Sequence, residues 1–299
     1  MSRLVGILYV AVSASAFGTM AIFARLAYEA GANPMTCLFL RFTIAGLVMA
    51  LAMLGKGIPF PKGRNLIVLI LMGTIGYVGQ SFCYFTSLTM ASAGLVAILL
   101  YLYPAFVTIL SSLILKTRAS KLKITALCIS LLGTFIILGG GGEGKPLGIL
   151  LALIGPLIYA VYIITGSKVV SRVGAFPSSA VIIMSAAAFY SGVIFFQGTG
   201  FPQTWTGWIS VVAIALICTV IAIVTFLEGL KRLDPATASI ISTLEPVVTV
   251  VLAALVLGED ITLTKISGGA LILFSLILLA RAEKRAEGGR ELEEEKEHK

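Results

Sequence analysis

The residues of this sequence best suited to chemistry are a few charged side chains that interrupt long apolar runs. Arg41 lies within one such run, and Glu245 directly precedes Pro246 in another. An ionisable group inside an apolar segment is costly to bury, and it commonly serves binding or transport. Proline removes a helical N–H and opens the local helix, so carbonyl groups near Glu245 are expected to be accessible. We therefore predict that Arg41 and Glu245 belong to a binding or gating site.

The depths of Arg41 and Glu245 suggest that the two side chains can meet. At a rise of 1.5 Å per residue, Arg41 lies about 10 Å and Glu245 about 18 Å from the same membrane face. Two long side chains bridge an axial gap of about 8 Å. One interpretation is a pair that faces the solute or gates its path, and the other is a structural pair that locks two helices. The spacing is compatible with both interpretations.

Two other charges lie closer to the ends of apolar runs. Arg25 has Glu29 one helical turn further on, which favours an interfacial ion pair, with a gating role as the alternative. Glu228 is followed by Lys231 and Arg232, so we expect a surface pair there.

Small and polar residues recur in the run that contains Gln80. They are spaced three or four residues apart, as expected for one face of a helix: Gly73, Gly76, Gln80, Cys83 and Ser87. Close helix packing is one interpretation of this stripe and a binding surface is the other. Gln80 is a candidate binding residue because a buried amide needs partners or water.

Tyrosines in the middle of apolar runs are a further set of candidates. They are Tyr77, Tyr84, Tyr101, Tyr103, Tyr159 and Tyr162. Tyrosine in a membrane protein is usually placed at the interface, and a buried hydroxyl needs a partner. A hydrated cavity would supply one, so we predict that part of this set binds solute. Pro104 and Pro246 are predicted to have a structural or gating role.

Enzymatic activity is not predicted, because the necessary side chains are missing. The single histidine is His298, near the end of the chain, which excludes His-based metal sites and Ser-His-Asp triads within the apolar runs. Glycines from Gly139 onward precede Gly144-Lys145, but Pro146 replaces the Ser or Thr that a P-loop requires. We predict no catalytic residues, no metal site, no cofactor and no nucleic-acid partner.

The amino-acid composition indicates that these residues lie in membrane-spanning segments. Of 299 residues, 58% are apolar and 12% are charged, with a mean hydropathy of +1.04, whereas a soluble domain is about 25% charged. The sequence predicts an all-α integral membrane protein with ten transmembrane helices. The expected spans are 4–28, 34–54, 65–88, 91–115, 122–139, 147–167, 177–197, 208–230, 236–257 and 262–281.

Lysine and arginine concentrate on alternate loops. The basic loops follow the second, fourth, sixth, eighth and tenth spans, and the intervening loops are nearly free of charge. The positive-inside rule therefore predicts cytoplasmic N and C termini in a multi-pass protein of the cell membrane. Trp205 and Trp208 then lie at the outer interface. The alternative for the first span, a cleaved signal peptide, is disfavoured because that span has a counterpart in the sixth.

The two halves of the chain resemble each other at a nearly constant offset. Leu102-Tyr103-Pro104 aligns with Leu244-Glu245-Pro246, and Gly6-Ile7-Leu8 aligns with Gly148-Ile149-Leu150. Five spans per repeat is an odd number, so the two repeats are predicted to be inverted, as in many transporters. We predict repeats at 4–139 and 147–281, an external Gly-rich linker at 140–146, and a charged cytoplasmic tail at 282–299.

The sequence resembles the drug/metabolite transporter superfamily, in particular its EamA-type permeases. The matching motifs are Pro34, Leu40-Arg41-Phe42-x-x-Ala45-Gly46, Tyr159-Ala160, Leu244-Glu245-Pro246-Val247 and Leu257-Gly258-Glu259, with Gly268 or Gly269 in the tenth span. The sequence departs from the family pattern at Phe17-Gly18, Lys116-Thr117 and Glu228. The resemblance implies a central cavity between the first four helices of each repeat, with the fifth and tenth helices at the periphery.

The patterns predict a transporter of small organic solutes, and the resemblance to the family implies export of amino acids or related metabolites. It would work by alternating access, as a monomer or homodimer in the lipid bilayer, with a small-molecule substrate. The alternatives are a channel, and an integral-membrane enzyme or lipid-handling protein.

Overall fold

The computed structural model describes residues 3–116, 119–139 and 143–297. Ten helices in these residues are long and apolar enough to cross a membrane, and the same residues contain no β-strand. The predicted all-α architecture with ten spans is confirmed. Part of the predicted linker, residues 140–142, and the last two residues of the predicted tail, including His298, lie outside the described ranges.

The first repeat contributes five spans, three of which are interrupted. In chain order its elements are α1 (Arg3–Gly18), α2 (Met20–Glu29), α3 (Pro34–Gly55), α4 (Gly63–Leu71), η1 (Met72–Val78), α5 (Gly79–Leu88), α6 (Ala93–Leu100), α7 (Tyr103–Ile114) and α8 (Lys121–Leu138). The second repeat contributes α9 (Pro146–Val173), α10 (Ala175–Gln197), α11 (Trp205–Ala215), η2 (Leu216–Ile221), α12 (Ala222–Leu230), α13 (Pro235–Ile241), η3 (Ser242–Leu244), α14 (Glu245–Leu257) and α15 (Leu263–Glu297).

Two of these helices are longer than predicted. The sixth span continues six residues beyond the predicted end, to Val173, so Lys168 and Arg172 lie on a helix and not in a loop. The tenth span continues as one helix into the predicted tail, as far as Glu297. Gly174, with a φ of 95°, ends the sixth span because a residue with a side chain rarely adopts that backbone conformation.

The interruptions repeat between the two halves. The third span of each repeat contains a π-helical segment, beginning at Met72 in η1 and at Leu216 in η2. The fourth span of each repeat breaks just before its proline: α7 and α14 carry Pro104 and Pro246 in their first turn. Proline is tolerated there because the first turn has no helical acceptor for its missing N–H. The backbone thus shares the internal symmetry of the sequence.

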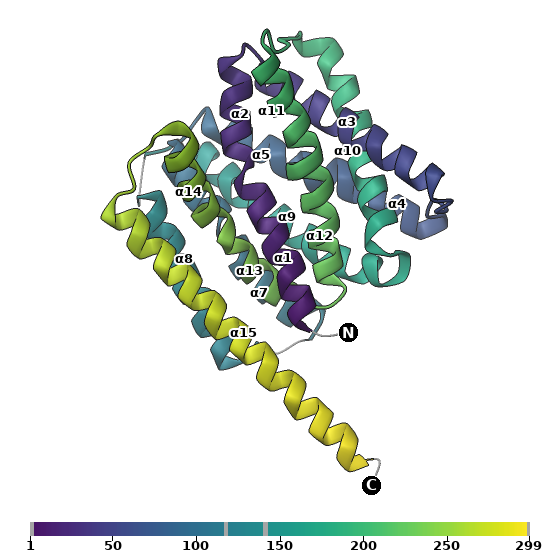
Figure 1. Cartoon of the computed structure of the whole chain (residues 1–299), viewed down its shortest axis with the longest axis vertical. Helices are drawn as coiled ribbons and strands as arrows, with labels where there is room; N and C mark the ends of the chain where they lie inside the picture. Colours follow the sequence, from purple (N-terminus) through teal and green to yellow (C-terminus); the bar gives the residue numbers. More distant parts are fainter. Residues whose placement is uncertain (1–2, 117–118, 140–142, 298–299) are drawn as a thin grey trace.

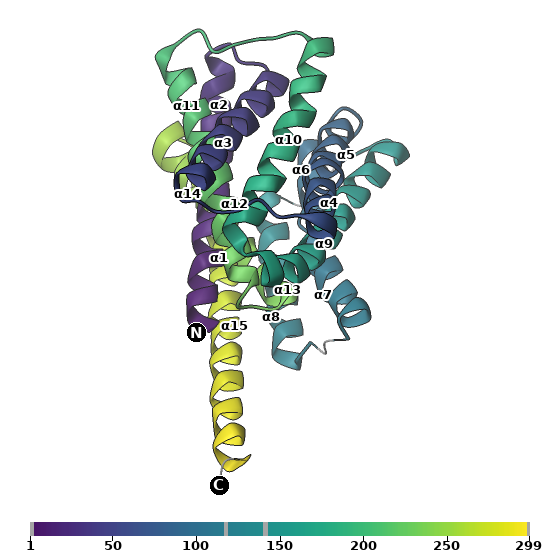
Figure 2. The ribbon, with the colours of Figure 1, turned by 90° about the vertical axis from the view of Figure 1, so that its right-hand side faces the viewer.

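The spans assemble into two bundles, and each bundle contains helices from both repeats (Figures 1 and 2). The first bundle contains α1, α2 and α3 with α11, α12, α13 and α14. The second bundle contains α4 to α7 with α9 and α10. Helices α3 and α10 pack on each other where the bundles meet.

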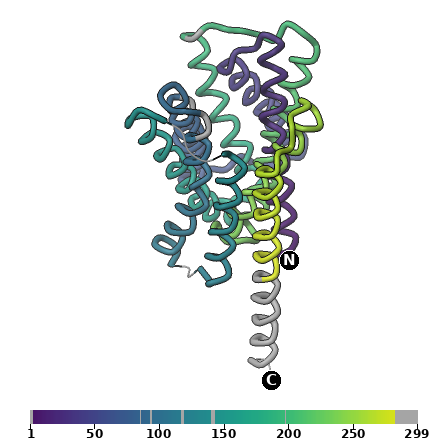
Figure 3. The backbone as a smooth tube through the Cα atoms, turned by 90° about the vertical axis from the view of Figure 1, so that its left-hand side faces the viewer, coloured from purple at the N-terminus to yellow at the C-terminus, as the bar shows by residue number. Residues whose placement is uncertain are grey.

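The fifth and tenth spans, α8 and α15, pair along one edge of the molecule (Figure 1). They cross closely at Gly133 and Gly268, where an added Cβ on either glycine would lie 2.6 Å from the carbonyl oxygen of the other. The start of α1 lies at the end of the molecule toward which α15 runs, as Figure 3 shows. We call this end the terminal face.

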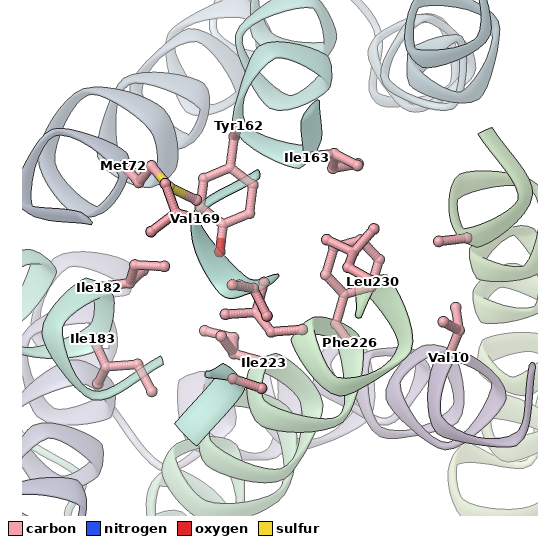
Figure 4. Close-up of a cluster of buried hydrophobic side chains, with 14 of the residues drawn as sticks. Val10, Met72, Tyr162, Ile163, Val169, Ile182, Ile183, Ile223, Phe226 and Leu230 are labelled. Atoms are coloured by element: carbon pink, nitrogen blue, oxygen red, sulfur yellow. The ribbon is translucent and has the colours of Figure 1, made fainter. Parts of the chain in front are cut away.

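Apolar side chains join the two bundles on the terminal side of the molecule. Figure 4 shows Met72, Tyr162 and Ile182 of the second bundle around the same core as Ile223 and Phe226 of α12. All five side chains are buried. Burial of this apolar surface holds the bundles together on that side.

Candidate functional site

Arg41 lies at the junction of the two bundles and is buried, with 5% of its surface exposed. Within the first bundle, its Nε donates to Thr219 Oγ1 at 2.6 Å and its guanidinium donates to the Cys218 carbonyl at 3.2 Å. Toward the second bundle, it donates to the Tyr77 hydroxyl at 2.9 Å. Its charge also lies 4.9 Å from the centre of the Phe42 ring. Arg41 therefore links the bundles, and no carboxylate of the described residues contacts it.

The two π-helical segments supply these partners. Tyr77 belongs to η1, and Cys218 and Thr219 belong to η2. A π-helical turn shifts the hydrogen-bond register and occurs frequently at functional sites. In η2 the Thr219 hydroxyl donates to the carbonyl of Ile214, five residues back, and the Cys218 carbonyl accepts from Arg41. Cys218 and Thr219 were not among the predicted site residues, although they are an adjacent polar pair in an otherwise apolar run.

Arg41 and Glu245 do not form an ion pair in the described part of the chain. The guanidinium is occupied by the groups named above and by the Met20 sulfur at 3.2 Å, and no hydrogen bond or ion pair joins it to the carboxylate. The two charges act on each other at longer range. The residue spacing allowed a direct pair, but it could not reveal the partners that η1 and η2 present to Arg41.

Glu245 begins α14 and is half-buried. Its carboxylate has no protein hydrogen bond or ion pair among the residues that the structure describes. Its backbone is fixed by α1, because the Thr249 hydroxyl donates to the Gly18 carbonyl at 2.9 Å. Gly18 lies so close that an added Cβ would be 2.8 Å from the Glu245 carbonyl oxygen. The backbone of Glu245 is thus held closely against α1, and its carboxylate is available to another group.

The second bundle presents a cluster of tyrosines to this carboxylate. The tyrosine cluster comprises Tyr77, Tyr101, Tyr103, Tyr159 and Tyr162. Its rings are linked in series, with centroids 6.2 Å apart for Tyr77 and Tyr162, 5.7 Å for Tyr159 and Tyr162, 5.0 Å for Tyr103 and Tyr159, and 6.5 Å for Tyr101 and Tyr103. Tyr101, Tyr103 and Tyr159 lie within electrostatic range of Glu245. The structure therefore brings five of the six predicted tyrosines together.

The sixth predicted tyrosine, Tyr84, also lies within electrostatic range of Glu245. Gln80 is one turn before it on α5 and is half-buried, and its side chain has no hydrogen bond to the described residues. Tyr190 was not predicted, yet it stacks on Phe42 at 5.5 Å and so extends the ring series through α3 to α10. Its position inside an apolar run was the signal that identified the other tyrosines.

The remaining predicted charges lie at the ends of the spans. Arg25 pairs with Glu29 at 3.1 Å, as expected, and also with Glu259 at 3.2 Å, and about half of its side chain is exposed. Glu228 pairs with Arg232 at 2.5 Å. These contacts fit ion pairs near the two faces, and neither Arg25 nor Glu228 joins the site around Arg41.

One ion pair links the repeats at the terminal face. Lys123 Nζ of α8 lies 2.6 Å from Asp234 Oδ2, and Asp234 caps α13 by accepting from the Thr237 N–H at 3.1 Å. Burial by itself raises the pKa of the Asp234 carboxyl, but Lys123 and the bonds from Thr237 outweigh it and hold this pKa below its usual value. Asp234 is therefore ionised and stabilises the fold near neutral pH.

The architecture defines a class of protein. Ten spans in two inverted repeats, interrupted helices, and polar groups that meet between two bundles are the features of a secondary transporter. Within the described ranges, no group of three or more His, Cys, Asp or Glu side chains is placed to hold a metal ion.

Comparison with known proteins identifies the family. The model of the EamA-like transporter family matches residues 4–139 and 146–281, so the chain belongs to that family. It is 27% identical over 288 residues to the uncharacterized transporter YcbK of Bacillus subtilis, covering 90% of each chain. It is 28% identical over 256 residues to the uncharacterized inner membrane transporter YedA of Escherichia coli, covering 82% of this chain and 81% of YedA.

A solved crystal structure shares the fold. The two chains superpose with a TM-score of 0.80 at 24% sequence identity, covering 96% of this chain and 100% of the other. The family match and the ten apolar spans together identify the protein as a multi-pass membrane transporter of the EamA-like family.

Proposed function

We propose that the protein exports small organic solutes, such as amino acids or related metabolites, from the cytoplasm by alternating access. The solute would bind between the two bundles, in contact with Glu245 and the tyrosine cluster. Gln80 and Tyr84 complete this proposed site, and Pro104 and Pro246 are proposed as the points at which the fourth span of each repeat bends. Arg41 is assigned the role of the link between the bundles.

The observation that carries this proposal is the position of the Glu245 carboxylate. It belongs to the first bundle, lies within electrostatic range of tyrosines of the second bundle, and has no protein partner in the described residues. A partly buried carboxylate without a partner is costly, and such groups in membrane proteins commonly mark a solute or ion pathway. Aromatic rings on the opposite side offer apolar surface and hydroxyl groups to an organic solute.

Alternating access is supported by the bundles themselves. Because each bundle contains helices from both repeats, we propose that the moving units are these mixed bundles and not the five-helix repeats. Apolar side chains close the contact between the two bundles on the terminal side. The interrupted helices near the site supply positions at which the bundles can bend.

We propose that the terminal face lies in the cytoplasm and that the protein resides in the cell membrane. The basic loops support this orientation. Reporter fusions test it: a fusion at Lys62 is expected to report a cytoplasmic position and one at Gly200 an external position. The opposite result at both positions would overturn the orientation and the direction of export with it.

The solute class is tested by a screen in vesicles of known orientation. Everted vesicles that contain the protein are expected to accumulate at least one radiolabelled amino acid above vesicles with the Glu245→Gln variant. If no amino acid or related metabolite is transported while the protein is folded, the proposed solute class is wrong. Flux that never saturates would instead indicate a channel.

A further inference from the structure

A basic pocket lies at the terminal face, away from the site between the bundles. It has a volume of about 360 Å³ and is formed where α4 begins, α7 ends and α9 approaches its end. Its cationic side chains are Arg64, Lys168 and Arg172, and Asn65 and Thr165 add polar groups. No aspartate or glutamate is among the described residues that line it.

The three cations are exposed, and none of them makes an ion pair in the residues that the structure describes. Two other basic side chains at this face are paired, Lys123 with Asp234 and Arg232 with Glu228. The pocket therefore concentrates positive charge that an anionic ligand would neutralise.

An apolar groove continues from the pocket along the side of the molecule. It has a volume of about 450 Å³ and runs between the third and sixth spans, past Ile75 and Leu157. The pocket and the groove share Val68, Val161 and Thr165. Ile75 is 62% exposed and Val161 is 48% exposed, so the groove is open on the side where a membrane-spanning bundle meets lipid tails.

We infer that the pocket and groove together bind one anionic phospholipid. The phosphate headgroup lies against Arg64, Lys168 and Arg172, and an acyl chain lies in the groove past Val161. Basic pockets between transmembrane helices bind anionic lipid headgroups by the same charge complementarity. The continuous apolar groove favours a lipid over a soluble phosphate, because a soluble phosphate gains nothing from it.

The test is retention of lipid by the purified full-length protein. The protein is incubated in detergent with equal amounts of phosphatidylglycerol and phosphatidylcholine, and lipid-bound protein is measured by native mass spectrometry. Each basic side chain near an anionic lipid strengthens binding roughly fivefold. Removal of all three in Arg64→Gln/Lys168→Gln/Arg172→Gln is therefore expected to weaken phosphatidylglycerol binding on the order of a hundredfold.

Two matched variants test what lipid binding depends on. The first tests whether binding requires the pocket cations and not the overall charge of the protein, and the second tests whether it requires the groove as well as the headgroup contacts. Lys56→Gln/Lys121→Gln/Arg281→Gln removes three basic side chains that do not line the pocket, and it is expected to bind phosphatidylglycerol like the wild type. Val161→Trp fills the groove and leaves the cations in place, and it is expected to lose most of the retained lipid. If the triple glutamine variant does not fold, Arg64→Lys/Arg172→Lys keeps the charge and is expected to retain phosphatidylglycerol within about fivefold of wild type.

Three results would overturn the inference. One is equal retention of phosphatidylglycerol by the triple glutamine variant and the wild type. A second is an equal loss in the control triple variant, which would indicate unspecific attraction. The third is displacement of the lipid by glycerol phosphate or inorganic phosphate together with unchanged binding in Val161→Trp, which would assign the pocket to a soluble anion.

Discussion

The Arg41 guanidinium donates a 2.9 Å hydrogen bond to the Tyr77 hydroxyl, and this bond joins the two helix bundles at the centre of the protein. Both residues come from the first repeat, yet they lie in different bundles because the second and third spans separate after the loop between α3 and α4. The other strong bond of Arg41, to Thr219 at 2.6 Å, stays within the first bundle. These two bonds are expected to have different roles.

The bond between Arg41 and Thr219 is predicted to stabilise the fold. Thr219→Val removes a buried acceptor from a charged donor, and a hydrogen bond to a charged group contributes about 1.5–3 kcal/mol. The thermal midpoint of the purified protein is expected to fall clearly. Thr225→Val on the same span is the control, because Thr225 donates to backbone carbonyls of its own helix. Equal midpoints for the two variants would contradict a structural role for the Thr219 bond.

The bond between Arg41 and Tyr77 is predicted to act on transport and only weakly on stability. Tyr77→Phe removes the hydroxyl but keeps the ring, whose centre lies 5.7 Å from the charge. Losing a hydrogen bond to a charged group costs about 1.5–3 kcal/mol, so the balance between two arrangements of the bundles shifts by about tenfold or more. The rate of solute exchange should change by a similar factor while the thermal midpoint stays within a few degrees. Tyr9→Phe serves as the control, because the Tyr9 ring packs against Arg232 and lies far from the site around Arg41. An exchange rate that Tyr77→Phe leaves unchanged would refute the role of this bond in linking the bundles.

The pair of Asp234 and Lys123 predicts a defined pH dependence of stability. Because the pKa of Asp234 is lower in the folded chain, the pair stabilises the protein above the unfolded pKa of about 3.9 and this contribution is lost as the pH falls through the folded pKa. Asp234→Asn is thus expected to lower the thermal midpoint at pH 7 and to approach wild type below about pH 4.

A helix cap without a titratable group provides the comparison for Asp234. Ser92 caps α6 by accepting from the Leu95 N–H, and Ser92→Ala should have an effect that does not vary with pH. A pH-independent difference between Asp234→Asn and wild type would show that the cap, and not the ion pair, is responsible.

Glu245 is predicted to couple transport to a proton gradient. A direct pair with Arg41 would have kept the carboxylate ionised and made coupling weak, but the structure holds Arg41 with other partners. Glu245→Gln is therefore expected to retain solute exchange and to lose accumulation driven by a pH gradient. Glu259→Gln, in the exposed loop between α14 and α15, should retain both. Gradient-driven accumulation that survives in Glu245→Gln would contradict this coupling.

Much of the fold was predictable from the sequence because lipid imposes simple rules. Long apolar runs, basic loops and the repeated prolines determine the spans and the inversion. The end of the sixth span was misplaced because Lys168 and Arg172 resemble loop residues, although both continue a helix up to Gly174.

The candidate site was predictable in its residues and not in its contacts. Arg41, Glu245 and the tyrosines stand out because polar groups are rare in apolar runs. The partners of Arg41 depend on two π-helical segments, and η1 and η2 have no signature in residue types. The mixing of repeats in each bundle depends on long-range packing that local patterns do not encode.

Trans-stimulation in proteoliposomes tests the central claim, that this is an alternating-access carrier with its site between two bundles. Vesicles are loaded with the amino acid selected by the screen, and entry of the labelled form is followed over a range of external concentrations. A carrier predicts uptake that saturates and that accelerates when unlabelled solute is present on the opposite side. Uptake that rises linearly with concentration and ignores the solute on the opposite side would contradict the account.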